Sequence, residues 1–352
     1  MLTISRPTGI DGGDGNDLVI VAKVDFTVDW QRKAQFDMVG GAGQDTTEIG
    51  SAVVALYAPG TKTGLTDYDV LGFETILFTG GTLKIIDYQG LGGSPIFGAY
   101  SESVECHVDG QTYQMGVGND GGTVVANDVT FFGGEGSDAF TVRMGRRALI
   151  YGGDGTDSLT LKWGARGYGG AGSDTILAAG DSTAYGGFGN DSFFDNGVGA
   201  TLFGDFGDDR FDLSFDSWEP GESLHVVYGG AGTDNVTVHR TTAQIDLGTG
   251  GDKITLTDQI NASQVPNVAD VILSTGSGAD VVYFNDTDGT GTVTIVDFDV
   301  ARDRMSMGFA HLSDFDAVSS NAQGVTLTEQ GYAFVLLGVS QVELTDAILL
   351  FN

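Results

Sequence analysis

Cysteine, basic residues and long apolar runs are scarce in this sequence, and the scarcity of each argues against a structural feature or a class of partner. Cys106 is the only cysteine, so no disulfide can form within the chain. The 16 Lys and Arg stand against 48 Asp and Glu, and the formal net charge of -32 makes nucleic acid an unsuitable partner. No window approaches about 18 consecutive apolar residues, and residues 1–7 lack the apolar centre of a signal peptide. We therefore expect no membrane span and no cleavable secretory signal at this terminus.

Histidines and catalytic motifs are also sparse. The sequence has four histidines, and neither His-Glu-x-x-His nor Gly-x-Ser-x-Gly occurs in it. Cys106 and His107 could pair as nucleophile and base, but adjacent residues of a strand point to opposite faces. Asp208 and Asp209 could act as paired carboxylates on a glycan, although metal ligation and solvation explain them more simply. Whether the chain is an enzyme stays open, and the absence of these motifs favours a non-enzyme.

Glycine and aspartate, in contrast, are abundant and recur in one pattern. The sequence Gly-Gly-x-Gly-x-Asp, or a close variant, begins at residues 12, 40, 115, 133, 152, 169, 186, 204, 229, 247 and 275. Between residues 115 and 204 successive copies begin 17 to 19 residues apart. A motif that recurs at a fixed short period predicts a solenoid, in which each copy stacks on its neighbours.

The residue types of this motif suit a hard cation. Glycine adopts positive φ at little cost, so a turn rich in glycine can direct its carbonyl oxygens to one point. The closing aspartate adds a carboxylate to those carbonyls. Ca²⁺ takes about six to eight oxygen ligands, whereas zinc or copper would be expected to use His or Cys. We therefore predict that the motifs bind several Ca²⁺ ions.

Apolar residues follow most motifs at alternate positions, which predicts strands with one face turned inward. The clearest pairs are Phe140 and Val142, Leu159 and Leu161, Phe211 and Leu213, Val236 and Val238, Ile254 and Leu256, and Val282 and Phe284. Because the period is twice that of a nonapeptide repeat, each coil has one motif turn and one plain turn, as at residues 163–167, 179–182 and 196–199. We expect the ions in a single file along one edge, with the opposite edge mostly empty.

These features together predict an all-β chain that folds as a right-handed parallel β-roll or β-helix with a C-terminal β cap. Residues 1–114 form an irregular β-helical part with two motif turns, and strands are expected near residues 18–22, 52–57, 74–78 and 83–88. Residues 115–291 form the regular roll. Residues 292–352, where the period stops, form the cap that a solenoid needs over its last coil.

The motifs resemble the nonapeptide Gly-Gly-x-Gly-x-Asp-x-(apolar)-x of the RTX family of type I-secreted bacterial proteins. Residues 295–304 resemble the segment after the roll in secreted RTX hydrolases, and residues 344–351 resemble their uncleaved secretion signal. The resemblance implies export by the type I secretion machinery to the extracellular medium or cell surface, and Ca²⁺ held between successive turns by carboxylates and loop carbonyls. The acidic residues implied as metal ligands are Asp14, Asp17, Asp45, Asp120, Asp138, Asp154, Asp157, Asp174, Asp191, Asp205, Asp209, Asp234, Asp252 and Asp280.

Two functions of different classes remain open. The first is a secreted structural protein that folds and self-associates in calcium as a surface-layer, matrix or adhesion component, because repeats and cap occupy nearly the whole chain. The second is a glycan-active or glycan-binding β-helix of the lyase or epimerase type, with its site within residues 46–114. Arg143, Arg146 and Arg147 form the only dense basic cluster. It is a candidate contact for an anionic cell-surface glycan or a neighbouring copy, although ion pairs with local Asp are the more ordinary interpretation.

Overall fold

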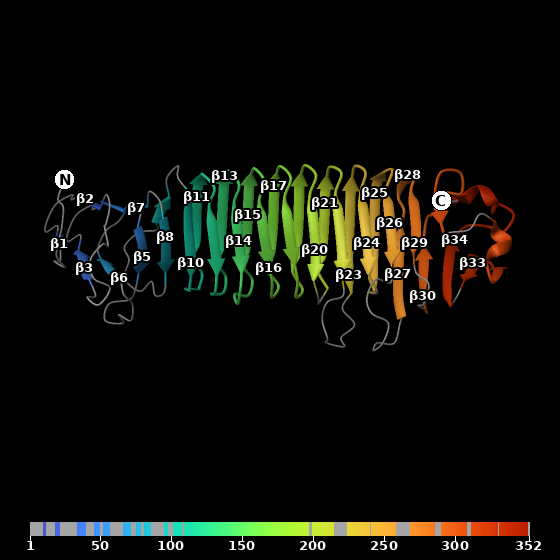
Figure 1. Ribbon diagram of the computed structural model, residues 1–352, viewed down its shortest axis with the longest axis horizontal. Coiled ribbons are helices and arrows are strands. Elements are labelled where there is room, and N and C mark those ends of the chain that lie inside the picture. Colours follow the sequence, from blue (N-terminus) through green and yellow to red (C-terminus); the bar gives the residue numbers. More distant parts are fainter. Residues whose placement is uncertain are drawn as a thin grey trace. The chain divides into compact units, whose positions relative to one another are not determined.

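A computed structural model describes the strand backbones within residues 10–97 and most of residues 101–350. The described ranges of the second part are 101–107, 109–196, 199–214, 224–239, 241–257, 268–285, 290–307, 311–329 and 331–350. They are almost entirely β (Figure 1), and their helices are the short 3₁₀ turns η1 (Leu312–Asp314) and η2 (Asp346–Ile348). No helix among the described residues is both long and apolar enough to cross a membrane.

The chain forms two compact units, Met1–Gly167 (unit 1) and Tyr168–Asn352 (unit 2). Both consist of parallel strands in two main sheets, in which successive coils contribute one strand to each sheet. This arrangement confirms the parallel β-roll. We call the sheet that follows each motif sheet 1, and the sheet whose strands carry the motif glycines sheet 2.

In unit 1, sheet 1 has the longer series of strands. It contains β1 (Ile10–Asp11), β3 (Ala34–Val39), β5 (Ala52–Leu56), β6 (Thr66–Leu71), β8 (Gly81–Ile85), β10 (Glu102–Cys106), β12 (Gly121–Val124), β14 (Ala139–Val142) and β16 (Ser158–Leu161). Sheet 2 contains β11 (Thr112–Val117), β13 (Thr130–Glu135) and β15 (Leu149–Asp154), and a smaller sheet contains β2 (Leu18–Val21), β4 (Thr46–Ile49), β7 (Thr75–Phe78) and β9 (Pro95–Phe97). The strands expected near residues 18–22, 52–57, 74–78 and 83–88 are therefore present as β2, β5, β7 and β8. Strand β17 (Arg166–Ala171) crosses from unit 1 into unit 2 along the chain.

In unit 2, both sheets continue to the C-terminal part. Sheet 1 contains β18 (Thr175–Ala178), β20 (Ser192–Asn196), β22 (Arg210–Ser214), β24 (Asn235–His239), β26 (Lys253–Thr257), β29 (Val281–Asn285), β31 (Arg304–Ser306) and β35 (Leu349–Leu350). Sheet 2 contains β19 (Thr183–Phe188), β21 (Thr201–Phe206), β23 (His225–Ala231), β25 (Ala243–Gly250), β27 (Val268–Ser274), β28 (Ser277–Gly278), β30 (Thr290–Ile295), β34 (Tyr332–Leu337), β33 (Gly324–Glu329) and β32 (Ala317–Ser320). Strands β34, β33 and β32 pair antiparallel, so they end the parallel series and form the predicted cap.

The core lies between the two sheets and is filled by alternate residues of each strand. The inward positions predicted from the alternation are buried at Phe140, Val142, Leu159, Leu161, Phe211, Leu213, Val236, Val238, Ile254, Leu256 and Val282. Phe284 is the exception and is only half-buried. Its ring meets the rings of Tyr332 and Phe334 edge-on.

Cys106 and His107 lie on opposite faces of sheet 1, as the strand geometry predicts. The thiol of Cys106 is fully buried and accepts a hydrogen bond from the Tyr113 hydroxyl at 3.4 Å. The His107 ring is partly exposed and lies 2.6 Å from a Glu105 carboxylate oxygen. The two side chains cannot act together as nucleophile and base.

The two edges of the roll differ in the length of their turns. At the motif edge, sheet 2 leads into sheet 1 through segments of constant length, residues 136–138, 155–157, 189–191, 207–209 and 232–234. At the plain edge, sheet 1 returns to sheet 2 through segments of different length, such as residues 143–148, 162–165 and 179–182. All variation in coil length among these coils therefore enters at the plain edge.

A column of aromatic rings runs along the outer face of sheet 2 in unit 2. Tyr168, Tyr185, Phe203 and Tyr228 stack in succession with ring centroids 4.8, 4.6 and 4.7 Å apart and planes within 4° to 7° of parallel. Because the ring faces contact each other, the column presents ring edges to solvent. The column therefore joins neighbouring coils and offers few free ring faces on which a sugar could stack.

We expect Tyr185→Ala to lower the free energy of unfolding of unit 2 by about 1–3 kcal/mol. The reason is that each aromatic pair contributes roughly 0.5–1.5 kcal/mol beyond buried area, and Tyr185 makes two such contacts. Chemical denaturation at saturating calcium measures the change. Tyr185→Phe keeps both stacked contacts and should stay close to wild type; an equal loss in both variants would contradict a role for stacking.

Candidate metal centre

The aspartate that closes each motif is buried at the motif edge. The register places these side chains in line: Ser192 pairs with Arg210, for example, which sets Asp191 beside Asp209. Their exposed fractions are 3% or less. The structure thus gathers most of the predicted ligands into one file in each unit, Asp120, Asp138 and Asp157 in unit 1, and Asp174, Asp191, Asp209, Asp234, Asp252 and Asp280 in unit 2.

Each file is joined by a repeated hydrogen bond from the backbone to the next carboxylate. In unit 1 the Asp120 N–H donates to Asp138 Oδ1 at 2.7 Å, and the Asp138 N–H donates to Asp157 Oδ1 at 2.8 Å. In unit 2 the same bond recurs from Asp174 onward at 2.7–3.1 Å. One oxygen of each accepting carboxylate, from Asp138 and Asp157 in unit 1 to Asp280 in unit 2, is therefore held in place by the coil before it.

The other oxygen, Oδ2, is buried and accepts no hydrogen bond within the described part of the chain at Asp138, Asp191, Asp209, Asp234, Asp252 and Asp280. A buried anionic oxygen without a partner is strongly disfavoured. Burial accordingly raises the pKa of Asp138, Asp191, Asp234, Asp252 and Asp280 to about 6 and that of Asp209 to about 7. Carboxylates of adjacent turns push these pKa values further up, while the backbone hydrogen bond acts in the opposite direction.

Oδ2 faces a small space that the first glycine of the motif leaves open. A Cβ atom on Gly204 would lie 2.3 Å from Asp209 Oδ2 and 2.3 Å from the carbonyl oxygen of Gly229. Gly133 in unit 1 shows the same arrangement with the carboxylate of its own motif and the carbonyl of the next. A carboxylate oxygen and a carbonyl oxygen from successive turns therefore converge, and no side chain can occupy the space between them.

These oxygens fit a calcium ion better than other metals. Among the described residues, no point is approached by three or more His, Cys, Asp or Glu side chains. A cation would be held by carboxylates of successive turns together with backbone carbonyls. An all-oxygen set in a glycine-rich turn suits Ca²⁺, whereas zinc prefers nitrogen and sulfur ligands.

The remaining predicted ligands lie elsewhere or outside the described residues. The Asp154 side chain is exposed, and its carbonyl oxygen accepts the Gly136 N–H at 2.8 Å. Asp205 replaces the second glycine of its motif at a φ of 70°; burial raises its pKa, and its charge raises the pKa of Asp209. Asp14, Asp17 and Asp45, and the side chains of residues 46–100, lie outside the described residues.

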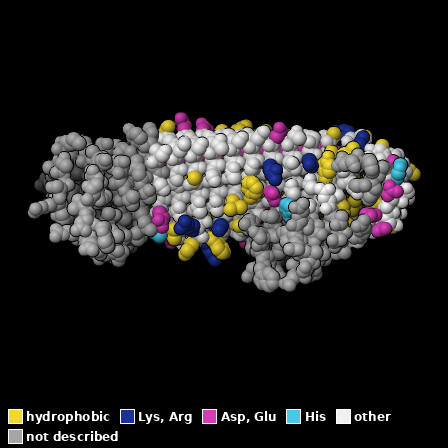
Figure 2. All heavy atoms as spheres, in the orientation of Figure 1, with side chains coloured by type: hydrophobic (Ala, Val, Ile, Leu, Met, Phe, Trp, Pro, Cys, Tyr) yellow, Lys and Arg dark blue, Asp and Glu magenta, His cyan; other side chains and the backbone are white. Residues whose placement is uncertain are grey.

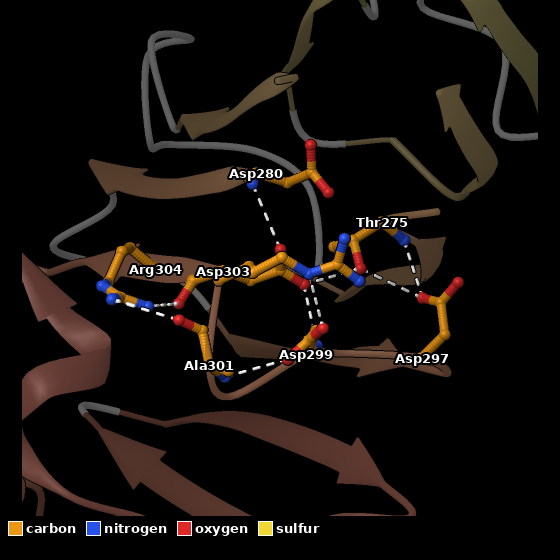
Figure 3. A network of polar contacts seen from close by, with 8 residues as sticks. Thr275, Asp280, Asp297, Asp299, Ala301, Asp303 and Arg304 are labelled. Atoms are coloured by element: carbon orange, nitrogen blue, oxygen red, sulfur yellow. Dashed lines mark hydrogen bonds and ion pairs between the residues drawn. The ribbon is translucent and has the colours of Figure 1, made fainter. Parts of the chain in front are cut away.

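Asp303 ends the file of unit 2, and the motif pattern did not identify it because no glycine pair precedes it. Asp303 Oδ1 accepts the Asp280 N–H at 3.1 Å (Figure 3). Its Oδ2 accepts the Thr275 hydroxyl at 3.0 Å and the Asp299 N–H at 2.8 Å, so the protein itself satisfies both oxygens. Strand β31 begins directly after Asp303, as other strands begin directly after the motif aspartates. This shared position is the signal that could have identified Asp303.

Two pairs of residues could suggest catalysis, Asp208 with Asp209 and Asp195 with His225, but neither pair is arranged to act on a substrate. Asp208 is exposed and accepts the Thr233 N–H at 2.7 Å, while Asp209 points into the file, so the two carboxylates do not face a common substrate. Asp195 accepts a short hydrogen bond from the His225 ring, but both side chains are fully buried in the core. Neither arrangement is open to a substrate.

Gly189→Ala is expected to disrupt the motif turn and lower the unfolding midpoint of unit 2 markedly. Gly189 has a φ of 125°, and a Cβ there would lie 1.8 Å from the Gly172 carbonyl oxygen, so the turn would have to move. Gly338→Ala is the matched control, because its φ of 78° imposes similar strain but nothing lies within 4 Å of the added atom. Thermal unfolding with calcium should show a much larger loss for the first variant; equal losses would mean that strain alone matters.

No family model matches the chain, and no curated protein matches it. The fold alone therefore defines the structural class of this protein, which is a parallel β-roll with a C-terminal β cap.

Proposed function

We propose that this chain is a calcium-binding structural protein of the RTX type, exported through a type I secretion machinery and working outside the cell or at its surface. The observation that carries the proposal is the file of buried carboxylates whose Oδ2 atoms accept no hydrogen bond and converge with glycine carbonyl oxygens. A bound divalent cation would supply the positive charge that these oxygens need.

The extracellular location is supported by the expected affinity and by the charge. Calcium modules of this kind outside cells bind with Kd of about 10⁻⁴ to 10⁻³ M, near external calcium levels and above cytosolic ones. A chain with a net charge of -32 would repel itself in a compact state unless cations bind it. These properties suit a surface-layer, matrix or adhesion component that folds after export.

Calcium titration of two neighbouring variants tests the proposal. Asp209→Asn removes one charge from the file, whereas Asp208→Asn removes one charge from the exposed position beside it. Isothermal titration calorimetry should show fewer or weaker sites in Asp209→Asn, including the sites next to it, and an unchanged isotherm in Asp208→Asn. A wild-type chain that is folded and binds no calcium, or two variants with the same reduced binding, would refute the proposal.

A further inference from the structure

Two neighbouring turns at the plain edge of unit 1 gather positive charge and exposed apolar side chains. They connect β14 to β15 and β16 to β17. Met144 is 69% exposed and Trp163 is 55% exposed, and Figure 2 shows Lys and Arg side chains beside hydrophobic ones at the lower edge. We call this surface the basic patch, and it consists of Arg143, Met144, Arg146, Arg147, Lys162, Trp163 and Arg166.

Contacts between adjacent turns hold the basic patch in shape. The Arg147 guanidinium pairs with both carboxylate oxygens of Asp128, at 2.7 and 2.6 Å. The Trp163 indole N–H donates to the Arg143 carbonyl oxygen at 3.2 Å, which fixes the ring while most of its surface faces solvent. Groups that are already ordered lose less conformational entropy on binding a partner.

Most basic residues of the patch form no ion pair within the described residues, although the charge of Asp109 also acts on Arg147. Arg147 has its partner in Asp128, but Arg143, Arg146, Lys162 and Arg166 form no side-chain ion pair within the described residues. Together the patch holds five of the chain's 16 Lys and Arg, on a chain with 48 Asp and Glu. The ordinary interpretation of the cluster, ion pairing with local Asp, therefore accounts for Arg147 alone.

The opposite edge of the same coils carries negative charge. Glu135 ends β13 and Asp154 ends β15, and both side chains are exposed at the motif edge. Unit 1 thus presents a positive plain edge and a negative motif edge at the same level of the roll. Each copy of the chain carries the surface that complements its own basic patch.

We propose that the basic patch binds the motif edge of a second copy of this chain, near Glu135 and Asp154. Two basic patches repel each other, so the contact joins unlike surfaces and repeats from copy to copy as an open row. Arg, Trp and Met are the residue types enriched at the centres of protein interfaces, which favours a protein partner. The inference rests on the proposed function in one respect, because the motif edge is expected to take its shape only with calcium bound.

Sedimentation velocity in calcium tests the contact with charge-reversed variants. The chain at about 10 mM Ca²⁺, well above the expected Kd of the sites, should form species larger than the monomer that dissociate at about 1 M salt, where the Debye length falls to about 3 Å. Arg143→Glu with Arg146→Glu should weaken association about tenfold or more, as charge reversal at a complementary interface does. Lys253→Glu, the same kind of change on sheet 1 of unit 2, should associate like wild type.

A mixing experiment then identifies the two surfaces. Glu135→Lys with Thr156→Lys makes the motif edge positive at two exposed positions. This variant and a variant with Arg143→Glu, Arg146→Glu, Lys162→Glu and Arg166→Glu should each remain monomeric, because the first is positive and the second negative on both surfaces. When the two are mixed, unlike charges face each other again and assembly should return.

The outcomes separate this inference from the proposed function. Circular dichroism with and without calcium reports folding for every variant. A chain that folds in calcium but stays monomeric, or variants that assemble as wild type does, would overturn the contact and leave calcium binding intact. Patch-dependent binding of the monomer to dextran sulfate or to phosphatidylglycerol vesicles, without self-association, would overturn it in favour of an anionic glycan or lipid.

Discussion

Removing calcium with EGTA is expected to abolish most of the β-sheet circular dichroism of this chain. Without a cation, the six buried Oδ2 atoms that accept no hydrogen bond within the described residues must carry unpartnered charge or take up protons. At tenfold excess over Kd, each independent site contributes about 1.4 kcal/mol of stability. Several such sites together are comparable to the roughly 5–15 kcal/mol by which a typical domain is stable.

Far-ultraviolet circular dichroism across a calcium titration measures this directly, with magnesium as the control. Mg²⁺ demands compact octahedral geometry and keeps several waters, so it should restore little of the signal. A spectrum in EGTA that matches the calcium-loaded spectrum would show that the files are satisfied by protons or by the protein alone.

In calcium-depleted buffer, stability is expected to fall as the pH rises from about 4 to about 7. The file aspartates have an unfolded pKa near 3.8 and folded pKa values raised to about 6 at Asp191 and Asp234 and about 7 at Asp209. Between these limits the folded chain binds more protons than the unfolded chain, so a higher pH favours unfolding. With saturating calcium the trend should reverse, because the ion binds the ionised carboxylates and protons compete with it.

Circular dichroism of the calcium-depleted chain from pH 4 to pH 8 checks the sign, because the folded fraction should fall as the pH rises, and the two asparagine variants separate the file from the general charge. Asp209→Asn should be less sensitive to pH than wild type, because its most strongly shifted group no longer titrates. Asp208→Asn removes the same charge from the surface, and because that charge only adds to the raised pKa of Asp234 and Asp252, the slope should change less than in Asp209→Asn. Equal slopes in the two variants would assign the pH dependence to the net charge of the chain.

The parts of the fold that repeat locally could be predicted from the sequence. The spacing of the glycines and the alternation after each aspartate contain both the turn and the inward face, so residues such as Phe140 and Leu213 were correctly placed in the core. The same spacing placed Asp191 and Asp209 in adjacent coils, and the parallel register brings them into contact. The β cap was also predicted, because the motif period stops near residue 292; parallel pairing nevertheless continues through β30 and β31, and the antiparallel strands begin only at β32.

Contacts between segments without a shared motif could not be predicted in this way. Asp303 joins the file because β31 pairs with β29, and nothing in its immediate sequence resembles a motif. Asp195 and His225 lie 30 residues apart, and only the coil geometry brings them together in the core. The exposure of Asp154 depends on which way the third motif position faces, which the motif alone does not specify.

The motif turns keep a constant length, whereas the plain turns vary in length, so the roll tolerates insertions at the plain edge. Segments of different length, such as residues 143–148 and 179–182, occupy equivalent places in their coils at the plain edge, while the motif turns beside them keep one length. Doubling a loop's length costs only about 0.6 kcal/mol of closure entropy, so the plain edge of unit 2 should accept a foreign peptide, for example within residues 179–182. The roll would then serve as a scaffold that displays inserted sequences at intervals fixed by its own coils.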